Sequence, residues 1–310
     1  MLSLLIFLGV TELVIRVYIN FYTIYDIEMS RYATALKIPS SNPKIGHVHR
    51  PNSNAHLMNV DVHINSDGLR DREYPIERSD KDRIIFLGDS LTFAWGVQKS
   101  DAFEVLLEEA LNEKRPTAII NFGIGNYNTE QQVHLFLEKG LKYDPDKVVI
   151  FYFINDAEPT PTQSPWRFFG YSRAITFFWS KIHAVLDNIT STKSYEEYYS
   201  DLYRDDRQGW TNTRDAFLKI RNVCRDQGIA LQVIILPELH NLVNYPLAAE
   251  HKIIHRFLEQ NAIEYLDLAP LIANERVPPH DLWVALDDAH PNARAHRLIA
   301  EYSLSFISGD

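Results

Sequence analysis

Residues 83–96 read RIIFLGDSLTFAWG, in which four apolar residues, 84–87, run straight into a Gly-Asp-Ser triplet that ends at Ser90. An apolar run ahead of a turn predicts a strand that is buried on both faces of a parallel sheet. Ligands of such sheets bind beyond the carboxyl ends of the strands, where the next helix presents its N–H groups. Ser90 lies at this junction and is a candidate nucleophile. A helix cap is the alternative, because Asp89, Ser90 and Thr92 are all residue types that cap helices.

Four further β-branched runs follow, with helical patterns between them. Strands that are apolar nearly throughout and alternate with amphipathic helices predict a parallel sheet covered on both faces. We therefore expect one doubly wound α/β domain over residues 83–310. The runs are 118–122, 148–153, 231–236 and 264–268, and the helical patterns are 102–113, 129–141, 213–227 and 248–261.

Composition narrows the classes of protein to consider. The chain has 310 residues, 45% hydrophobic and 23% charged, which is enough for one large α/β core. Its formal net charge of −10 argues against a nucleic-acid partner, because neutralising phosphates requires clustered Lys and Arg. Cys224 is the single cysteine, so the chain forms no internal disulfide and no thiolate metal site. No cofactor is expected.

The first 22 residues, MLSLLIFLGVTELVIRVYINFY, are mostly apolar and lack a small-residue cleavage site. They are long enough to span a bilayer as a helix, and Glu12 and Arg16 are spaced to neutralise each other on one helix face. We therefore predict an uncleaved membrane-anchor helix over residues 1–23. The alternative is an amphipathic helix that packs on the domain or lies on a membrane surface.

Two further regions fall outside the repeat of strands and helices. Residues 24–82 are polar and turn-rich, with alternation in NVDVHIN and a turn at NSDGLRD. They predict an N-terminal extension of short strands rather than a separate domain. Residues 157–210 form an insertion that is dense in aromatic residues. Its rings either cap the end of the sheet and pack on one another or form a lid over a ligand.

A serine nucleophile needs a base and a group that orients the base. The segment LDDAHPNARAHRL, residues 286–298, supplies both in Asp287 and His290. One short turn can aim both side chains at one pocket, so that the carboxylate holds the imidazole while the other ring nitrogen faces Ser90. His296 is the competing base, but helix phase carries it away from a site mounted on a loop.

Two strand ends offer donors for the oxyanion of a tetrahedral intermediate. The turn INFGIGNYNT, residues 120–129, contains glycines at which a bare backbone N–H can approach a ligand. Asn155 ends the third strand, and its side-chain amide is a second candidate. A strand-terminating Asn-Asp turn is the alternative interpretation of Asn155.

Together these segments resemble the motifs of the SGNH, or GDSL-type, hydrolase family, and they occur in the family's order. The matches are GDS at 88–90, the glycine turn after the second strand, Asn-Asp after the third, and DxxHP at 287–291. The resemblance covers residues 83–307. It implies a flavodoxin-like three-layer α/β/α domain with a central parallel five-stranded sheet.

The resemblance also implies the roles of the candidate residues. Ser90 is expected to be the nucleophile, His290 the base and Asp287 the residue that orients it. The implied oxyanion donors are the N–H of Ser90, the N–H of either Gly125 or Asn126, and the amide of Asn155.

The chain departs from the family pattern at two positions. Asn126 stands where the family has its second-block glycine, with Gly125 one residue earlier, so either N–H could be the donor. Phe153 replaces the glycine of the third block, which makes the pocket wall beside Asn155 bulkier. Neither departure removes a catalytic group.

The resemblance predicts an esterase or deacylase that works through a Ser90 acyl-enzyme on an acylated small molecule or, more specifically, an O-acylated carbohydrate. The extension, with INSDGLRDREYP, resembles a bacterial membrane-attached subgroup associated with polysaccharide acylation. That subgroup implies that the catalytic domain is periplasmic or extracytoplasmic. It is also compatible with a membrane acyltransferase as a partner. An O-acyltransferase that passes the acyl group to a glycan uses the same triad. The alternative from another functional class is a non-catalytic subunit that binds or assembles a membrane polysaccharide-modifying complex.

Two pairs of histidines have spacings that metal ligands can use. HKIIH, residues 251–255, puts two histidines on one helix face, but position 252 is Lys rather than the Glu of a metalloprotease helix. A solvated helix face is the favoured interpretation. GHVHRPN puts His47 and His49 on one strand face with no third ligand apparent. We therefore predict no metal site.

Overall fold

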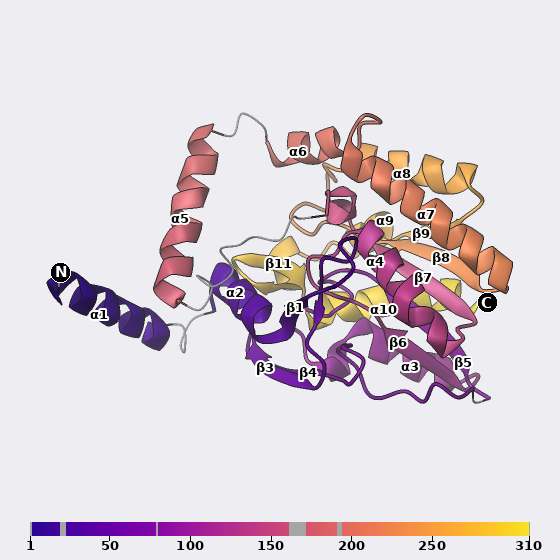
Figure 1. The fold of residues 1–310 in the computed structure, drawn as a ribbon. Coiled ribbons are helices and arrows are strands. Elements are labelled where there is room, and N and C mark those ends of the chain that lie inside the picture. The colour runs from indigo at the N-terminus through magenta and orange to yellow at the C-terminus, as the bar shows by residue number, and fades with distance from the viewer. Residues whose placement is uncertain (1, 19–22, 79, 161–171, 191–193, 310) are drawn as a thin grey trace.

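A computed structural model describes residues 2–18, 23–78, 80–160, 172–190 and 194–309 of the chain (Figure 1). Its centre is a five-stranded parallel sheet with the order β6-β5-β7-β8-β9, which is the flavodoxin-like order. All five predicted strands are present. They are β5 (Asp82–Leu87), β6 (Thr117–Asn121), β7 (Lys147–Tyr152), β8 (Ala230–Ile235) and β9 (Glu264–Asp267).

Helices cover both faces of the sheet, which confirms the predicted three-layer fold. Successive strand residues point to opposite faces. Ile85 and Leu87 therefore pack with α4, α7 and α8, whereas Ile84 and Phe86 pack with α3, α9 and α10. The helices are α3 (Phe103–Asn112), α4 (Thr129–Leu135), α7 (Gln208–Gln227), α8 (Ala248–Gln260), α9 (Ala269–Asn274) and α10 (Ala293–Ser308).

The strand order creates a crevice at the carboxyl edge of the sheet, beyond β5 and β7. These two strands are neighbours, but α3 after β5 and α7 after β7 lie on opposite faces of the sheet. Ligands of open α/β sheets bind at such a switch point. The fold thus brings the loops that carry Ser90 and Asn155 to one place.

The N-terminal extension contains the predicted short strands and one helix that was not predicted, α2 (Tyr25–Leu36). Its hairpin turns at Met58 and Asn59, both with positive φ, as a tight hairpin turn requires. Tyr32 of α2 and the hairpin pack against Phe93 and Trp95 of the loop that follows Ser90. The strands are β1 (Lys37–Pro39), β2 (His47–His49), β3 (Ser53–Leu57) and β4 (Val60–Ile64).

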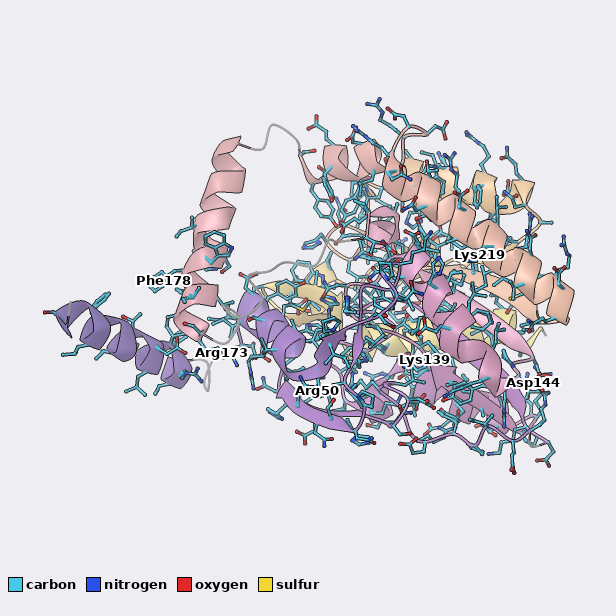
Figure 2. All side chains as sticks on the ribbon, viewed as in Figure 1. Arg50, Lys139, Asp144, Arg173, Phe178 and Lys219 are labelled. Atoms are coloured by element: carbon cyan, nitrogen blue, oxygen red, sulfur yellow. The ribbon has the colours of Figure 1, made fainter. Side chains whose placement is uncertain are left out.

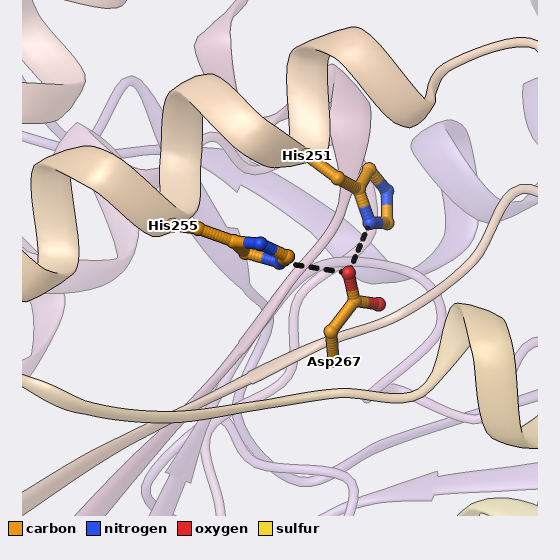
Figure 3. A group of neighbouring side chains, drawn as sticks. All are labelled: His251, His255 and Asp267. Carbon is orange, nitrogen blue, oxygen red and sulfur yellow. Dashed lines mark hydrogen bonds and ion pairs between the residues drawn. The ribbon is translucent and has the colours of Figure 1, made fainter.

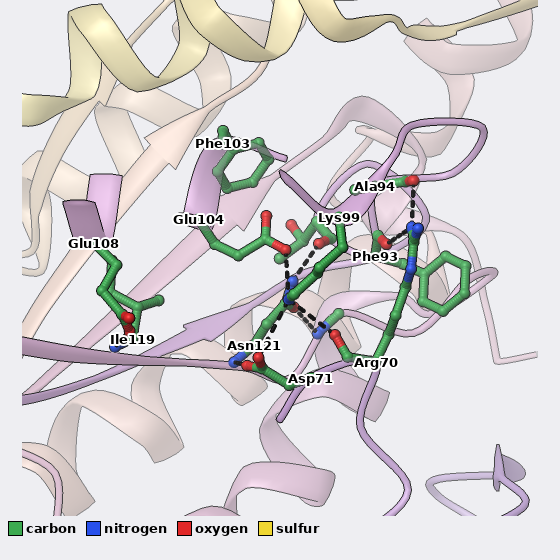
Figure 4. A network of polar contacts seen from close by, with 12 residues as sticks. Arg70, Asp71, Phe93, Ala94, Lys99, Phe103, Glu104, Glu108, Ile119 and Asn121 are labelled. Carbon is green, nitrogen blue, oxygen red and sulfur yellow. Dashed lines mark hydrogen bonds and ion pairs between the residues drawn. The ribbon is translucent and has the colours of Figure 1, made fainter. Parts of the chain in front are cut away.

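A buried polar network fastens the end of the extension to the loop after Ser90 (Figure 4). The Arg70 guanidinium donates to the carbonyl oxygens of Phe93, Ala94 and Val97 over 2.9, 2.6 and 2.7 Å. Burial lowers the pKa of Arg70 to about 10, so it remains protonated at neutral pH. Lys99 joins the network by donating to the Arg70 carbonyl over 3.0 Å. The loop carbonyls are thus satisfied by a charged donor and held in one geometry.

Two helices stand apart from the core, α1 (Leu2–Tyr18) and α5 (Arg173–Thr190) (Figure 1). The Glu12 carboxylate of α1 caps α5 by accepting from the N–H groups of Arg173 and Ala174 over 3.1 and 2.8 Å. Phe178 on α5 lies well away from the packed core (Figure 2). Among the described residues, no helix is both long and apolar enough to cross a membrane. That finding does not support the predicted transmembrane helix.

Parts of two sequence predictions fall outside the described residues. These parts are residues 1 and 19–22 of the predicted anchor and residues 161–171 and 191–193 of the aromatic insertion. The described remainder of the insertion includes α5 and α6 (Tyr195–Leu202).

Candidate active site

The turn after β5 exposes the Ser90 hydroxyl to the crevice because Asp89 makes the local capping contact. The Asp89 carboxylate accepts from the N–H of Leu91 over 2.9 Å, as an Asx turn does. A Cβ at Gly88 would lie 1.9 Å from Thr92 Oγ1, so this close approach requires glycine. Turns follow Ser90, and the next helical segments begin only at Lys99 and Phe103, so Ser90 caps no helix.

Ser90, His290 and Asp288 form a continuous hydrogen-bonded series. His290 Nε2 lies 2.8 Å from Ser90 Oγ, and His290 Nδ1 lies 2.5 Å from Asp288 Oδ1. Asp288 Oδ2 accepts from the Trp95 indole N–H over 2.8 Å, so both of its oxygens have donors. Burial raises the pKa of Asp288, but the hydrogen bonds from His290 and Trp95 outweigh it and leave the pKa below its usual value. Asp288 is therefore ionised at neutral pH.

The residue beside the imidazole is Asp288 and not the predicted Asp287. His290 and Asp288 lie two residues apart on the short strand β11 (Asp288–Pro291), so both side chains point to the same side. Asp287 falls in the turn between β10 (Trp283–Ala285) and β11, where it is exposed. Its carboxylate accepts from the backbone N–H of Tyr25 over 3.3 Å. We expected a loop around His290, but residues 288–291 form the short strand β11.

His296, the competing base, is buried on α10, where it contacts Phe103 rather than Ser90. Its Nδ1 accepts from the N–H of Phe103 over 3.0 Å, and its ring stacks on that of Phe103. Burial lowers the pKa of His296 to about 3. It is a neutral core residue, in agreement with the expectation from helix phase.

The turn after β6 offers the N–H of Asn126 and not that of Gly125. The Gly125 N–H donates to Tyr32 Oη over 2.9 Å and is occupied. Asn126 lines the same cavity as Ser90, and its N–H has no acceptor within the described part of the chain. Its φ is +66°, a left-handed conformation that glycine adopts freely and Asn tolerates. The two candidates that the sequence left open are thus distinguished.

Side chains of the extension hold this turn in place. Lys37 Nζ donates to the Gly125 carbonyl and to Asn126 Oδ1, both over 2.7 Å. His47 Nε2 lies 3.1 Å from the Gly125 carbonyl oxygen, so it contacts the same acceptor as Lys37. Lys37 is buried, and its two bonds lock both the backbone and the side chain of the turn.

Tyr32 and His49 form a second support under the turn. Tyr32 Oη accepts from the Gly125 N–H, so its own hydrogen can be donated to His49 Nε2, 2.6 Å away. His49 Nδ1 then donates to the Gly68 carbonyl over 3.1 Å. Burial, followed by the charge of Lys37, lowers the pKa of His49 to about 3. The neutral imidazole that this chain of bonds requires is therefore the form present.

Asn155 follows β7, and its side chain lines the cavity beside Ser90. The turn itself is held by Asp156, which accepts from Thr129 Oγ1 and Gln132 Nε2 over 3.2 and 3.0 Å. Burial raises the pKa of Asp89, and the Asn155 amide acts in the opposite direction.

The cavity at Ser90 has a volume of about 390 Å³, within the range of small-molecule sites. Sequence reasoning missed several of its residues, including Tyr25 of α2 and the pair Glu238 and His240, whereas Tyr195 of α6 belongs to the aromatic insertion for which a lid over a ligand was one interpretation. Glu238 and His240 follow β8 directly, so their place after a parallel strand was an available signal. The lining residues are Tyr25, Ser90, Leu91, Asn126, Phe153, Asn155, Tyr195, 237–240 and 287–291.

Comparison with known proteins gives one family match. The model of the GDSL-like Lipase/Acylhydrolase family matches residues 86–298, more than half of the chain. No curated protein matches the sequence at a significant level.

Several solved structures resemble this one at low sequence identity. A lipolytic protein of the G-D-S-L family from Desulfitobacterium hafniense, titled as putative, is 14% identical, with 72% of this chain and 98% of that chain covered and a TM-score of 0.46. An alpha/beta hydrolase enzyme from the metagenome of Lake Arreo is 16% identical, with 74% and 97% covered and a TM-score of 0.49. An acetylxylan esterase from Geobacillus stearothermophilus is 16% identical, with 74% and 95% covered and a TM-score of 0.46.

Proposed function

This chain belongs to the GDSL-like lipase/acylhydrolase family and is an ester hydrolase, and we propose that it cleaves esters through an acyl-enzyme on Ser90. The observation that carries the proposal is the series Ser90, His290 and Asp288, with 2.8 Å and 2.5 Å between the paired atoms. A serine attacks only when a base removes its proton, and the base works only in the correct tautomer. This series supplies both conditions.

The proposed reaction has two balanced halves. Ser90 Oγ attacks the ester carbonyl carbon while His290 Nε2 takes the hydroxyl proton, and Asp288 stabilises the imidazolium that forms. Collapse of the tetrahedral intermediate breaks the bond to the alcohol oxygen, which receives the proton from His290. Water then attacks the acyl-enzyme with His290 again as base, and the carboxylic acid leaves Ser90.

The oxyanion of each tetrahedral intermediate would be held by donors from three loops. In this proposal they are the N–H groups of Ser90 and Asn126 and the side-chain amide of Asn155. The free N–H of Asn126 and the position of Asn155 in the Ser90 cavity support the assignment. Donors fixed in advance stabilise the developing charge without reorganising.

We further propose that the substrate is a short acyl ester of a carbohydrate. A cavity of about 390 Å³ is at the small end of the range for ligand sites, which suits a short acyl group. Leu91, Phe153 and Leu239 give it apolar contacts for a short acyl group. Asp287, which is exposed, offers a carboxylate acceptor for the hydroxyl groups of a sugar.

The function is tested by assaying the full chain on acetylated oligosaccharides and by labelling with a fluorophosphonate. Free acetate should be released, and the label should attach to Ser90. Ser90→Ala should remove both signals while the circular-dichroism spectrum stays unchanged. Acetate release that survives in Ser90→Ala would contradict the mechanism, and absence of label on the folded protein would favour a binding subunit. Acylated glycan in place of free acetate would identify an acyltransferase.

For location, we propose that α1 and α5 hold the enzyme at a membrane surface. Phe7 and Leu13 on α1 are 64% and 62% exposed, and Trp179 on α5 is 62% exposed. Large apolar side chains gathered on helices favour the interfacial region of a bilayer. The full chain should sediment with phosphatidylethanolamine–phosphatidylglycerol vesicles, and the double substitution Phe7→Glu and Leu13→Glu should abolish this. Val243→Glu, at another exposed apolar position, is the control that should still bind.

A further inference from the structure

We propose that His251, His255 and Asp267 form a binding site for one divalent transition-metal ion of the zinc type (Figure 3). The two histidines lie one turn apart on α8, so their side chains point the same way. Asp267 ends β9, the edge strand against which α8 packs, and projects toward them. The expected solvated helix face is wrong for His251, which is buried.

The three ligand atoms are already gathered at one point. Asp267 Oδ2 lies 2.8 Å from His251 Nδ1 and 2.8 Å from His255 Nε2. All three atoms are within 4.8 Å of one another. Ligands at zinc bond lengths of about 2.0–2.2 Å in a tetrahedron stand roughly 3.3 Å apart. To admit the ion, Oδ2 would retreat by about 0.5 Å from each imidazole, and the two imidazole nitrogens, which lie within 4.8 Å of each other, would adjust to about 3.3 Å.

Each ligand is held by a further contact that leaves its coordinating atom aimed at the site. Asp267 Oδ1 accepts from the N–H of Ala269 over 2.9 Å, which leaves Oδ2 facing the histidines. The His255 ring stacks on Tyr265, with ring centroids 4.8 Å apart. A ligand set whose orientation is fixed beforehand loses less entropy when it binds.

Tyr245 gives His251 the partner that metal coordination requires. Coordination through Nδ1 places the single proton of the neutral imidazole on Nε2, where Tyr245 Oη lies 3.0 Å away and can accept it. Hydrogen bonds of this kind from ligating histidines fix the tautomer and the ring orientation. Tyr245 Oη also accepts from the N–H of Glu238 over 3.0 Å, and Glu238 lines the Ser90 cavity. The site thus braces one wall of that cavity.

The donor set selects the class of ion. Two imidazoles and one carboxylate suit zinc and its neighbours, whereas calcium and magnesium prefer oxygen ligands alone. With neutral imidazoles and an ionised carboxylate the site carries one negative charge, which favours a cation. The His255 side chain is 27% exposed, so an ion can enter from solvent and a water molecule can complete the coordination.

The test measures metal binding and is independent of esterase activity. Chelator-treated full chain is titrated with Zn²⁺ against a chromophoric competitor, and Co²⁺ is used to record the d–d spectrum of a tetrahedral site. The wild type should bind one tight equivalent, which raises its thermal unfolding temperature. His255→Ala and Asp267→Asn should lose this binding, and Tyr245→Phe should weaken it about 10- to 100-fold, as loss of an outer-shell partner does.

The matched control is His56→Ala, which removes an exposed histidine that also pairs with an aspartate, Asp61. It should bind zinc like the wild type. Circular dichroism establishes that each variant is folded before it is titrated. Equal binding by the wild type and His255→Ala, or equal loss in His56→Ala, would mean that zinc binds elsewhere and would overturn the proposal.

Discussion

The two sides of the Ser90 cavity are built in different ways. On one side, Ser90, Asp288 and His290 are placed by a strand end and a short hairpin of the α/β domain itself. On the other side, the turn at Gly125 and Asn126 is placed by residues of the N-terminal extension, far away in the sequence. The hydrogen-bonded series is carried by elements of the α/β domain, although Ser90 and His290 are 200 residues apart, whereas the turn that would hold the oxyanion depends on contacts from the extension. The extension is therefore part of the active site rather than an addition to it.

The second side has outside support at Asn126, a non-glycine residue with a positive φ of 66°. A non-glycine residue in the left-handed region costs on the order of 1–2 kcal/mol, less for Asn than for most residues. Lys37 offsets this cost by bonding to the Asn126 side chain as well as to the Gly125 carbonyl. The extension thus stabilises a non-glycine residue in the left-handed conformation at this turn.

The largest effect is expected where the sequence and the structure disagree, at Asp288. Asp288→Asn should lower kcat by roughly 10⁴-fold, because the imidazole loses the carboxylate that fixes its tautomer. Asp287→Asn should keep kcat within a few-fold of the wild type, since the imidazole of His290 is bonded to Asp288 while the Asp287 carboxylate accepts from the Tyr25 N–H; a contact between Asp287 and the sugar would change KM instead. Steady-state hydrolysis of an acetyl ester measures both. The reverse ranking would restore Asp287 as the orienting residue.

The next effect tests the oxyanion side at Asn155. Asn155→Ala should lower kcat by roughly 100- to 1000-fold, as removal of one oxyanion donor does. The midpoint of urea unfolding should change little, because Asp156 holds the turn. A loss of stability as large as the loss of activity would support the turn-forming interpretation instead.

A smaller effect tests the support that comes from the extension. Lys37→Met removes both hydrogen bonds to the turn, and a displaced N–H should lower kcat by about 10- to 100-fold with a smaller change in KM. Lys44→Met is the matched control, because Lys44 lies in the same extension but pairs with Glu130 on the surface. If the two variants behave alike, the extension does not position the turn.

The smallest effect is on stability and not on catalysis. The pKa of His49 is about 3 in the folded chain and close to 6.5 when unfolded, so the unfolded state binds more protons between these values. Its contribution is complete above pH 6.5 and is lost as the pH falls toward 3, by about 2 kcal/mol between pH 7 and pH 5. Urea unfolding at both pH values should show a smaller difference for His49→Gln than for the wild type. His63→Gln, at an exposed position, should match the wild type.

The sequence predicts the two sides of the cavity unequally well. The five strands, Ser90 and His290 follow from apolar runs and residue types that act over a few positions. Asp287 was predicted because its spacing from His290 on an expected loop could aim both side chains at one pocket, while the alternation of a short strand places Asp288 beside the imidazole. The choice of Asn126 over Gly125 depends on Tyr32, about 90 residues earlier in the chain. The spacing of residues within a motif carries no information about that long-range contact.

The contact between the Tyr25 N–H and the Asp287 carboxylate joins residues 262 positions apart. A ribosome makes Tyr25 early and Asp287 almost last, so this contact cannot form until synthesis is nearly complete. Until then Ile27, Tyr32 and Leu36 of α2, all buried in the finished protein, lack part of the surface that covers them. Segments made first usually fold first. Most of the apolar face of α2 is covered by β3 and by Phe93 and Trp95, which are made soon after it, and the contact with Asp287 is the part that waits for the end of synthesis.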